Sequence, residues 1–114
     1  MAMSMAMDDQ LFRDRADAAL GDLYRRLSAA SDQHPFEADF NSGALAIEFE
    51  APSAKFVVSP NAPVRQIWVS AHSKSFKLDW EDARGTFVLA PSQQTLVEMI
   101  CEAIGQQLGE PVSL

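Results

Sequence analysis

The sequence predicts an α+β fold, a two-layer sandwich in which two helices cover one face of an antiparallel sheet of about six strands. Apolar residues recur at helical spacing near both ends of the chain, and short runs of period two fill the middle. The turns between these runs are too short for the crossovers that parallel strands need. A chain of 114 residues with 47% hydrophobic residues suits one domain, residues 1–114, with a small core.

The first element predicted is a helix from Asp8 to about Ala30. Its apolar residues recur at steps of four, four, three and four and form one stripe: Phe12, Ala16, Leu20, Leu23 and Leu27. Asp8 and Asp9 precede the stripe and complement the positive end of the helix dipole. Residues 1–7 contain no Lys or Arg, so we interpret them as a leader outside the fold rather than a secretory signal.

Six short strands are predicted next, each alternating apolar and polar residues. The apolar, inward-facing positions are Phe36, Ala38 and Phe40; Leu45, Ile47 and Phe49; Phe56 and Val58; Ile67 and Val69; Phe76, Leu78 and Trp80; Phe87 and Leu89. Turn residues separate the first three strands at Asn41-Ser42-Gly43 and Ala51-Pro52-Ser53, and Pro60-Asn61-Ala62-Pro63 is expected to end the third. Because short turns join them, neighbouring strands should pair in antiparallel fashion.

A second helix is predicted after Pro91-Ser92, with Ser92 as its N-cap. Its inward stripe is Leu96, Ile100, Ala103, Ile104 and Gln107. Gly109 should end the helix, and Pro111 follows it. The two helices should together cover the apolar face of the sheet.

Composition excludes several classes of function. The net charge is -7, and residues 1–50 alone carry ten acidic and four basic side chains. Such a surface repels phosphate backbones and suits cations or a basic protein partner, so we expect no nucleic acid. No apolar run approaches the roughly 20 residues that span a bilayer, so no membrane is expected. A single cysteine, Cys101, is compatible with a reducing cytoplasm.

The first candidate functional residue is Trp68. If Ile67 and Val69 face the core, then Gln66, Trp68 and Ser70 face outward. A Trp on the outer face of a sheet is either packed beneath a loop or the N-terminal leader, or an exposed anchor for a partner, where Trp is enriched. Both alternatives stay open at this point.

The second candidate is an acidic edge, which contains Asp14, Asp17, Asp32, Glu37 and Asp39. Hard cations prefer several carboxylate oxygens. The alternative is an ordinary solvated acidic face. No His-x-x-x-His or Cys-x-x-Cys spacing occurs, so a metal site here would be exposed, weak and largely hydrated.

The sequence does not indicate an enzyme. Cys101 flanks the core stripe of the second helix, where a free cysteine behaves as a small hydrophobe. His34 and His72 fall in loops and are interpreted as surface residues, although His34 is also a candidate ligand of the acidic edge. Neither a Gly-rich phosphate loop nor a nucleophile elbow is present.

Five segments in order resemble the frataxin/CyaY family from about Asp8 to Leu114. They are Arg26-Leu27 at the end of the first helix, Asn41-Ser42-Gly43-Ala44-Leu45, Pro63-Val64-Arg65-Gln66-Ile67-Trp68-Val69, Asp79-Trp80, and Gln106-Gln107-Leu108-Gly109-Glu110-Pro111-Val112. The ordered set on a predicted helix–strands–helix chain carries the resemblance.

The resemblance implies an accessory protein of iron–sulfur cluster assembly that binds ferrous or ferric iron weakly and regulates a cysteine desulfurase and an iron–sulfur scaffold protein. It implies iron ligands among Asp14, Asp17, Asp32, Glu37 and Asp39. Partner contacts would come from Gln66, Trp68, Glu37, Asp39 and Asn41, and a cytoplasmic monomer is expected.

The sequence departs from the family pattern at the end of the first helix, which reads Tyr24-Arg25-Arg26-Leu27-Ser28-Ala29-Ala30-Ser31 where relatives usually carry several carboxylates. A regulator of the desulfurase that carries no iron is therefore the main alternative. A ferroxidase would need a preorganised two-metal carboxylate site, and no Glu-x-x-His motif is present.

Overall fold

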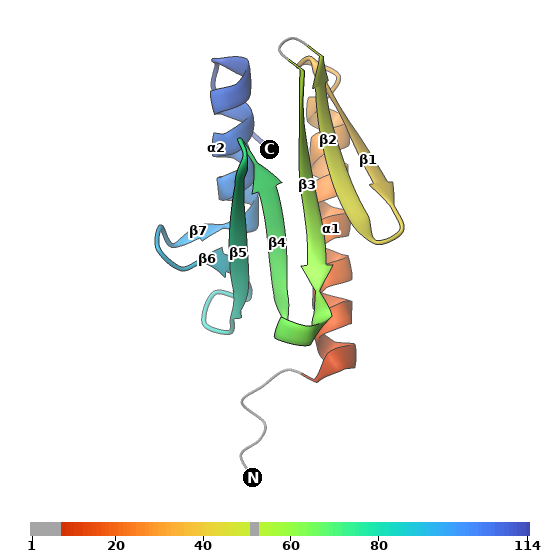
Figure 1. Cartoon of the computed structure of the whole chain (residues 1–114), viewed down its shortest axis with the longest axis vertical. Coiled ribbons are helices and arrows are strands. Elements are labelled where there is room, and N and C mark those ends of the chain that lie inside the picture. The colour runs from red at the N-terminus through yellow and green to blue at the C-terminus, as the bar shows by residue number, and fades with distance from the viewer. Residues whose placement is uncertain (1–7, 51–52) are drawn as a thin grey trace.

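The computed structural model describes residues 8–50 and 53–114, and in it two helices lie on the same side of one sheet (Figure 1). The elements in chain order are α1 (Asp9–Ala30), β1 (Phe36–Asn41), β2 (Ala44–Glu50), β3 (Ser53–Asn61), the 3-10 turn η2 (Ala62–Val64), β4 (Gln66–Ala71), β5 (Lys74–Glu81), β6 (Thr86–Leu89), β7 (Gln94–Thr95) and α2 (Leu96–Leu108). The predicted α+β sandwich is confirmed.

Helix α1 follows the sequence prediction closely. Its buried residues are the five of the predicted stripe, Phe12, Ala16, Leu20, Leu23 and Leu27. Asp8 is the N-cap, and its side chain accepts a hydrogen bond of 2.7 Å from the backbone N–H of Leu11. This bond satisfies one of the backbone donors that a helix leaves unpaired at its start.

The sheet is an antiparallel meander of seven strands, ordered β1 to β7 as in the chain. The prediction of about six strands missed β7, which has only two residues and is too short to show a period. The predicted hairpin turn at residues 41–43 is confirmed, since Ser42 and Gly43 have φ of 55° and 82°, the left-handed values that a two-residue hairpin turn requires. The turn predicted at residues 51–53 lies mostly outside the described residues.

The third strand ends within the predicted segment 60–63. The strand continues through Asn61, with Pro60 opposite Ile67 in the register of β4. The chain reverses one step later, through η2 and Arg65 at φ 55°. Proline lacks a backbone donor but tolerates extended backbone, which explains how it stays within the strand near its end.

Helix α2 corrects two predictions. Thr95, not Ser92, is the N-cap, and it forms a capping box with Glu98. Ser92 instead donates a hydrogen bond of 2.9 Å to Oε1 of Gln94. The buried stripe includes Met99, whereas Gln107 is only half-buried. Gly109 ends the helix at φ 73°, as predicted.

The capping box predicts a measurable difference between two neighbouring hydroxyl residues. Thr95→Ala should lower the free energy of unfolding by about 1 kcal/mol, because it leaves the Glu98 backbone N–H without its capping acceptor. Ser92→Ala, the matched control, should stay within about 0.5 kcal/mol of wild type. Urea denaturation of both variants checks this, and an equal loss in the two would contradict the observed cap.

One core lies between the helices and the sheet. It contains the buried stripes of α1 and α2 and the inward residues of β1 to β6, for example Leu45, Phe56 and Leu78. No described element covers the opposite face, where exposed side chains alternate with the buried ones along β4. Among the described residues, no helix combines the length and the apolar character that crossing a bilayer would need.

Candidate functional site

Trp68 lies on the uncovered face of the sheet. Its neighbours in β4, Ile67 and Val69, are 0% and 1% exposed, whereas Trp68 is 36% exposed. The outward orientation predicted from strand parity is therefore confirmed. With this exposure, Trp68 is not packed beneath a loop of residues 8–50 and 53–114. The other covering segment considered above, the leader of residues 1–7, lies outside the described residues.

A polar network holds the Trp68 ring in place. Its Nε1–H donates a hydrogen bond of 2.9 Å to Oε1 of Gln66, and Gln66 in turn donates one of 3.0 Å to Oδ1 of Asp79. Across the register, Lys77 faces Trp68 and its Nζ lies 5.0 Å from the ring centroid. This distance is within cation–π range. The indole is thus presented to solvent in a fixed orientation, which reduces the entropy lost on binding a partner.

Lys77 and Asp79 were absent from the predicted partner-binding set. They alternate with the apolar residues of β5, so parity alone places them on the outer face. The sequence alone does not determine the register between β4 and β5, which places Lys77 opposite Trp68 and Asp79 opposite Gln66.

An acidic strip runs over the outer face of β1 and β2, and we define it as Glu37, Asp39, Glu48 and Glu50. All four side chains are exposed. Glu37 lies directly opposite Glu48, and facing like charges destabilise a strand pair. Glu48 and Glu50 alternate with the inward-facing residues of β2, but they were not among the candidate site residues predicted from the sequence.

The acidic strip and Trp68 share one surface. Cross-strand partners run from Asp39 to Ala46, Val57 and Ser70, and Ser70 is two residues from Trp68 on the same side of β4. Three strand spacings separate β1 from β4, which is about 14 Å at roughly 4.8 Å each. One partner protein can therefore contact both at once.

The predicted iron ligands fall into two groups. Asp32, in the turn after α1, and Glu37 and Asp39, on β1, are exposed. Asp14 and Asp17 are exposed on α1, which packs on the opposite face of the sheet from Glu37 and Asp39. Asp17 also lies about 10 Å along the helix before Tyr24, the residue whose ring contacts Phe40 of β1. The structure does not bring the two groups together.

A preformed metal site is not found in the described part of the chain. There, no three side chains of His, Cys, Asp or Glu lie in positions to hold one ion. The exposed carboxylates of the strip still offer oxygen donors of the type that hard cations take. Such donors suit a loosely held, hydrated ion.

Two of the four arginines of α1, Arg25 and Arg26, pair with the same carboxylate of that helix. Arg26 Nε lies 2.8 Å from Oδ2 of Asp22, and Arg25 Nη2 lies 3.4 Å from its Oδ1. Arg26 also donates a hydrogen bond of 3.2 Å to the backbone oxygen of Leu114. Both guanidinium groups therefore neutralise Asp22, the last carboxylate within α1.

His34 links the start of β1 to the end of the chain. Its Nδ1 lies 3.1 Å from Oε2 of Glu110, and its ring stacks on Phe36. It also lines a surface hollow together with Glu37, Glu48 and Glu50. The imidazole thus adjoins the acidic strip, but one of its nitrogens already has a carboxylate partner.

Cys101 has the environment of a structural cysteine. It is half-buried on α2, and burial raises the pKa of its thiol. The protonated thiol is a poor nucleophile, which agrees with the interpretation of Cys101 as a small hydrophobe.

Two helices on one side of an antiparallel meander, with an exposed Trp and an acidic strip on the other side, define the frataxin-type α+β sandwich. A family model described as Frataxin-like domain matches residues 5–110. This chain belongs to the frataxin/CyaY family, as the ordered segments of its sequence predicted.

Individual relatives agree over nearly the whole length. The iron–sulfur cluster assembly protein CyaY of Pseudomonas aeruginosa is 32% identical over 108 residues, covering 93% of this chain and 95% of that protein. The protein of the same name in Azotobacter vinelandii is 26% identical over 108 residues, covering 93% and 94%. A solved structure of frataxin from Psychromonas ingrahamii shares the fold with a TM-score of 0.81 at 21% identity, covering 94% of this chain and 97% of that one.

Proposed function

We propose that this protein is a non-enzymatic accessory protein of iron–sulfur cluster assembly, which regulates a cysteine desulfurase and its scaffold protein in the cytoplasm. Its relatives in Pseudomonas aeruginosa and Azotobacter vinelandii are named iron–sulfur cluster assembly proteins. The single observation that carries the proposal is the exposed Trp68, fixed by Gln66 and Lys77 on an uncovered face that also bears the acidic strip.

The docking mode follows from the chemistry of that face. The acidic strip attracts a basic surface and speeds its encounter. Trp68 then supplies the apolar contact that loses its water on binding, the usual role of a central Trp in an interface. Gln66, Asn41 and the strip residues Glu37 and Asp39 form the polar rim of the same surface.

In this proposal iron is cargo that the surface carries, not a resident cofactor. Asp32, Glu37 and Asp39 would supply carboxylate oxygens to a ferrous or ferric ion that keeps most of its water. Asp14 and Asp17, further back along α1, would add to the negative field rather than to the same coordination sphere. Such an ion exchanges readily, which suits delivery.

A second candidate is a regulator of the desulfurase that carries no iron. Two observations favour it: the described residues contain no three-ligand cluster, and Asp22 is already paired with two arginines. The docking surface is the same in both candidates, so they differ only in whether iron binds.

An anaerobic titration with ferrous iron, followed by addition of the desulfurase–scaffold complex, tests the proposal and separates the two candidates. Iron carriage predicts selective paramagnetic broadening of amide resonances near residues 32–39. Binding of the complex without such broadening supports the iron-free regulator. If neither iron nor the complex binds, the proposed function is wrong.

The acidic strip yields a charge-removal prediction. Glu37→Gln with Asp39→Asn should weaken binding of both iron and the desulfurase, because the charges that attract them are lost. The free energy of unfolding should stay within about 0.5 kcal/mol or rise slightly, since Glu37 no longer repels Glu48. Calorimetric titration and thermal unfolding measure both.

Asp14→Asn with Asp17→Asn is the matched control, because it removes the same charge from the N-terminal half of α1. It should weaken binding clearly less than the strip variant. Equal losses would indicate a general charge effect rather than a localised site. A large fall in melting temperature of the strip variant would mean that its carboxylates have a structural role.

A further inference from the structure

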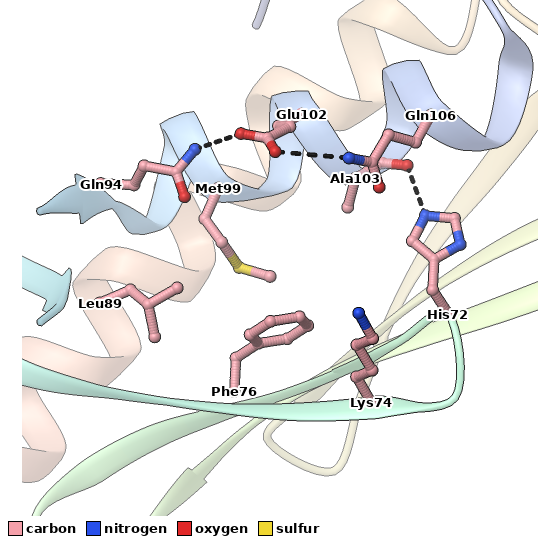
Figure 2. A pocket seen from close by; sticks show the side chains of 9 residues that line it. All are labelled: His72, Lys74, Phe76, Leu89, Gln94, Met99, Glu102, Ala103 and Gln106. Carbon is pink, nitrogen blue, oxygen red and sulfur yellow. Dashed lines mark hydrogen bonds between the residues drawn. The ribbon is translucent and has the colours of Figure 1, made fainter. Parts of the chain in front are cut away.

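A pocket lies on the helical side of the sheet, away from the proposed docking surface. Figure 2 shows it between helix α2, the turn that joins β4 to β5, and the strands β5 to β7. Its lining residues are His72, Lys74, Phe76, Leu89, Gln94, Met99, Glu102, Ala103 and Gln106. Its volume is about 210 Å³, below the roughly 300–1,000 Å³ of sites for drug-sized ligands, so it suits a smaller molecule.

One wall carries a carboxylate in a fixed position. Glu102 of α2 accepts a hydrogen bond of 2.5 Å from Nε2 of Gln94 on one oxygen and one of 3.4 Å from Nε2 of Gln106 on the other (Figure 2). No cation among the described residues pairs with it. Two amides therefore orient a negative charge that still has capacity to accept hydrogen bonds from an ammonium group.

The facing wall carries a cation. Lys74 begins β5, and its amine points toward α2 between His72 and Phe76 (Figure 2). Within the described residues it has neither an ion pair nor a hydrogen bond. It therefore offers three N–H donors to an anionic group in the pocket.

The turn that positions Lys74 is held to the helix. His72 and Ser73 have φ of 53° and 61°, left-handed values that cost energy in residues other than glycine. The Nε2–H of His72 donates a hydrogen bond of 3.0 Å to the backbone oxygen of Ala103, and its ring packs edge-on against Phe56. These contacts fix the turn, and with it the direction from which Lys74 enters the pocket.

Beside the two charges lies an apolar surface formed by Phe76, Leu89 and Met99 (Figure 2). A fixed carboxylate, a facing ammonium group and an apolar surface together match a small molecule with both charges and an apolar body. We propose that this pocket binds a free amino acid with an apolar side chain. Its ammonium group would meet Glu102, its carboxylate Lys74, and its side chain the apolar surface.

The test uses L-leucine as the probe and the methyl resonance of Met99 as the readout. Met99 is the one methionine outside residues 1–7, so its methyl signal in a ¹H–¹³C spectrum of methyl-labelled protein is readily assigned. L-Leucine should shift this signal in a saturable way in the millimolar range. L-Leucinamide, which lacks the carboxylate, and 4-methylpentanoate, which lacks the amine, should each bind at least fivefold more weakly.

Two variants address the walls separately. Glu102→Gln and Lys74→Gln should each weaken leucine binding at least fivefold, whereas Lys77→Gln, on the outer face of the same strand as Lys74, should not change it. Amide spectra of each variant check that the fold is kept. The proposal is overturned if 50 mM leucine causes no saturable shift, if both analogues bind as well as leucine, or if neither wall variant weakens binding.

Discussion

Replacing Trp68 by Ala is expected to lower affinity for the desulfurase–scaffold complex at least tenfold while leaving the melting temperature close to that of the wild type. A central interface Trp typically contributes about 2 kcal/mol or more, and about 1.4 kcal/mol already corresponds to tenfold. The stability of the free protein should change little, because more than a third of the side chain is exposed and its contacts are with Gln66 and Lys77 at the surface.

Two measurements on one variant decide this prediction: thermal unfolding of the free protein, and titration of the complex. Trp68→Phe is a useful companion, because it keeps an aromatic ring but removes the N–H that Gln66 accepts. It should recover part of the lost affinity if ring burial dominates. Collapse of the melting temperature in Trp68→Ala, with normal binding by the remaining folded protein, would show that the indole serves the core.

The fold was largely predictable from the sequence because its signals are local. The stripe of α1 and the alternation in β1 to β5 each arise from one buried face, and strand parity alone placed Trp68 outside the core. The sequence predictions failed at positions where contacts between elements determine the local structure, as at the start of α2. Thr95 rather than Ser92 caps α2 because two further residues, Gln94 and Thr95, pair with β6 before the helix begins. Strands of that length carry no periodic signal.

The candidate site was predictable only in outline. Glu37 and Asp39 could be assigned to an outer face, but their position opposite Glu48 depends on the register. Lys77 and Asp79 could likewise be assigned to the outer face, but their contacts with Trp68 and Gln66 depend on the register between β4 and β5. The pocket between α2 and the β4–β5 turn could not be foreseen, because Lys74 and Glu102 approach it from elements far apart in the chain.

Trp80→Ala is expected to have the opposite effect to Trp68→Ala and provides its matched comparison. Trp80 lies on β5, on the face that packs against the helices. Its ring contacts Phe87 edge-on at 5.2 Å between centroids, and the guanidinium carbon of Arg15 on α1 lies 4.2 Å from the ring centroid. Its Nε1–H donates a hydrogen bond of 2.6 Å to Asp82. Truncation therefore removes an aromatic contact with β6, a cation–π contact with α1 and a hydrogen bond to the turn after β5.

Loss of a core Trp costs about 3–5 kcal/mol, and the half-buried position of Trp80 favours the lower end of that range. At roughly 4 °C or more per kcal/mol for a domain near this size, the melting temperature should fall by about 10 °C or more. The folded fraction should bind the desulfurase–scaffold complex within about twofold of wild type, because Trp80 lies on the side of the sheet away from the docking surface. Calorimetry of both Trp variants, with binding measured well below their melting temperatures, makes the comparison. If Trp68→Ala proves the more destabilising of the two, the assignment of Trp68 as the outer and Trp80 as the inner Trp is wrong. The docking surface proposed for this protein would then be wrong as well, because it depends on that assignment.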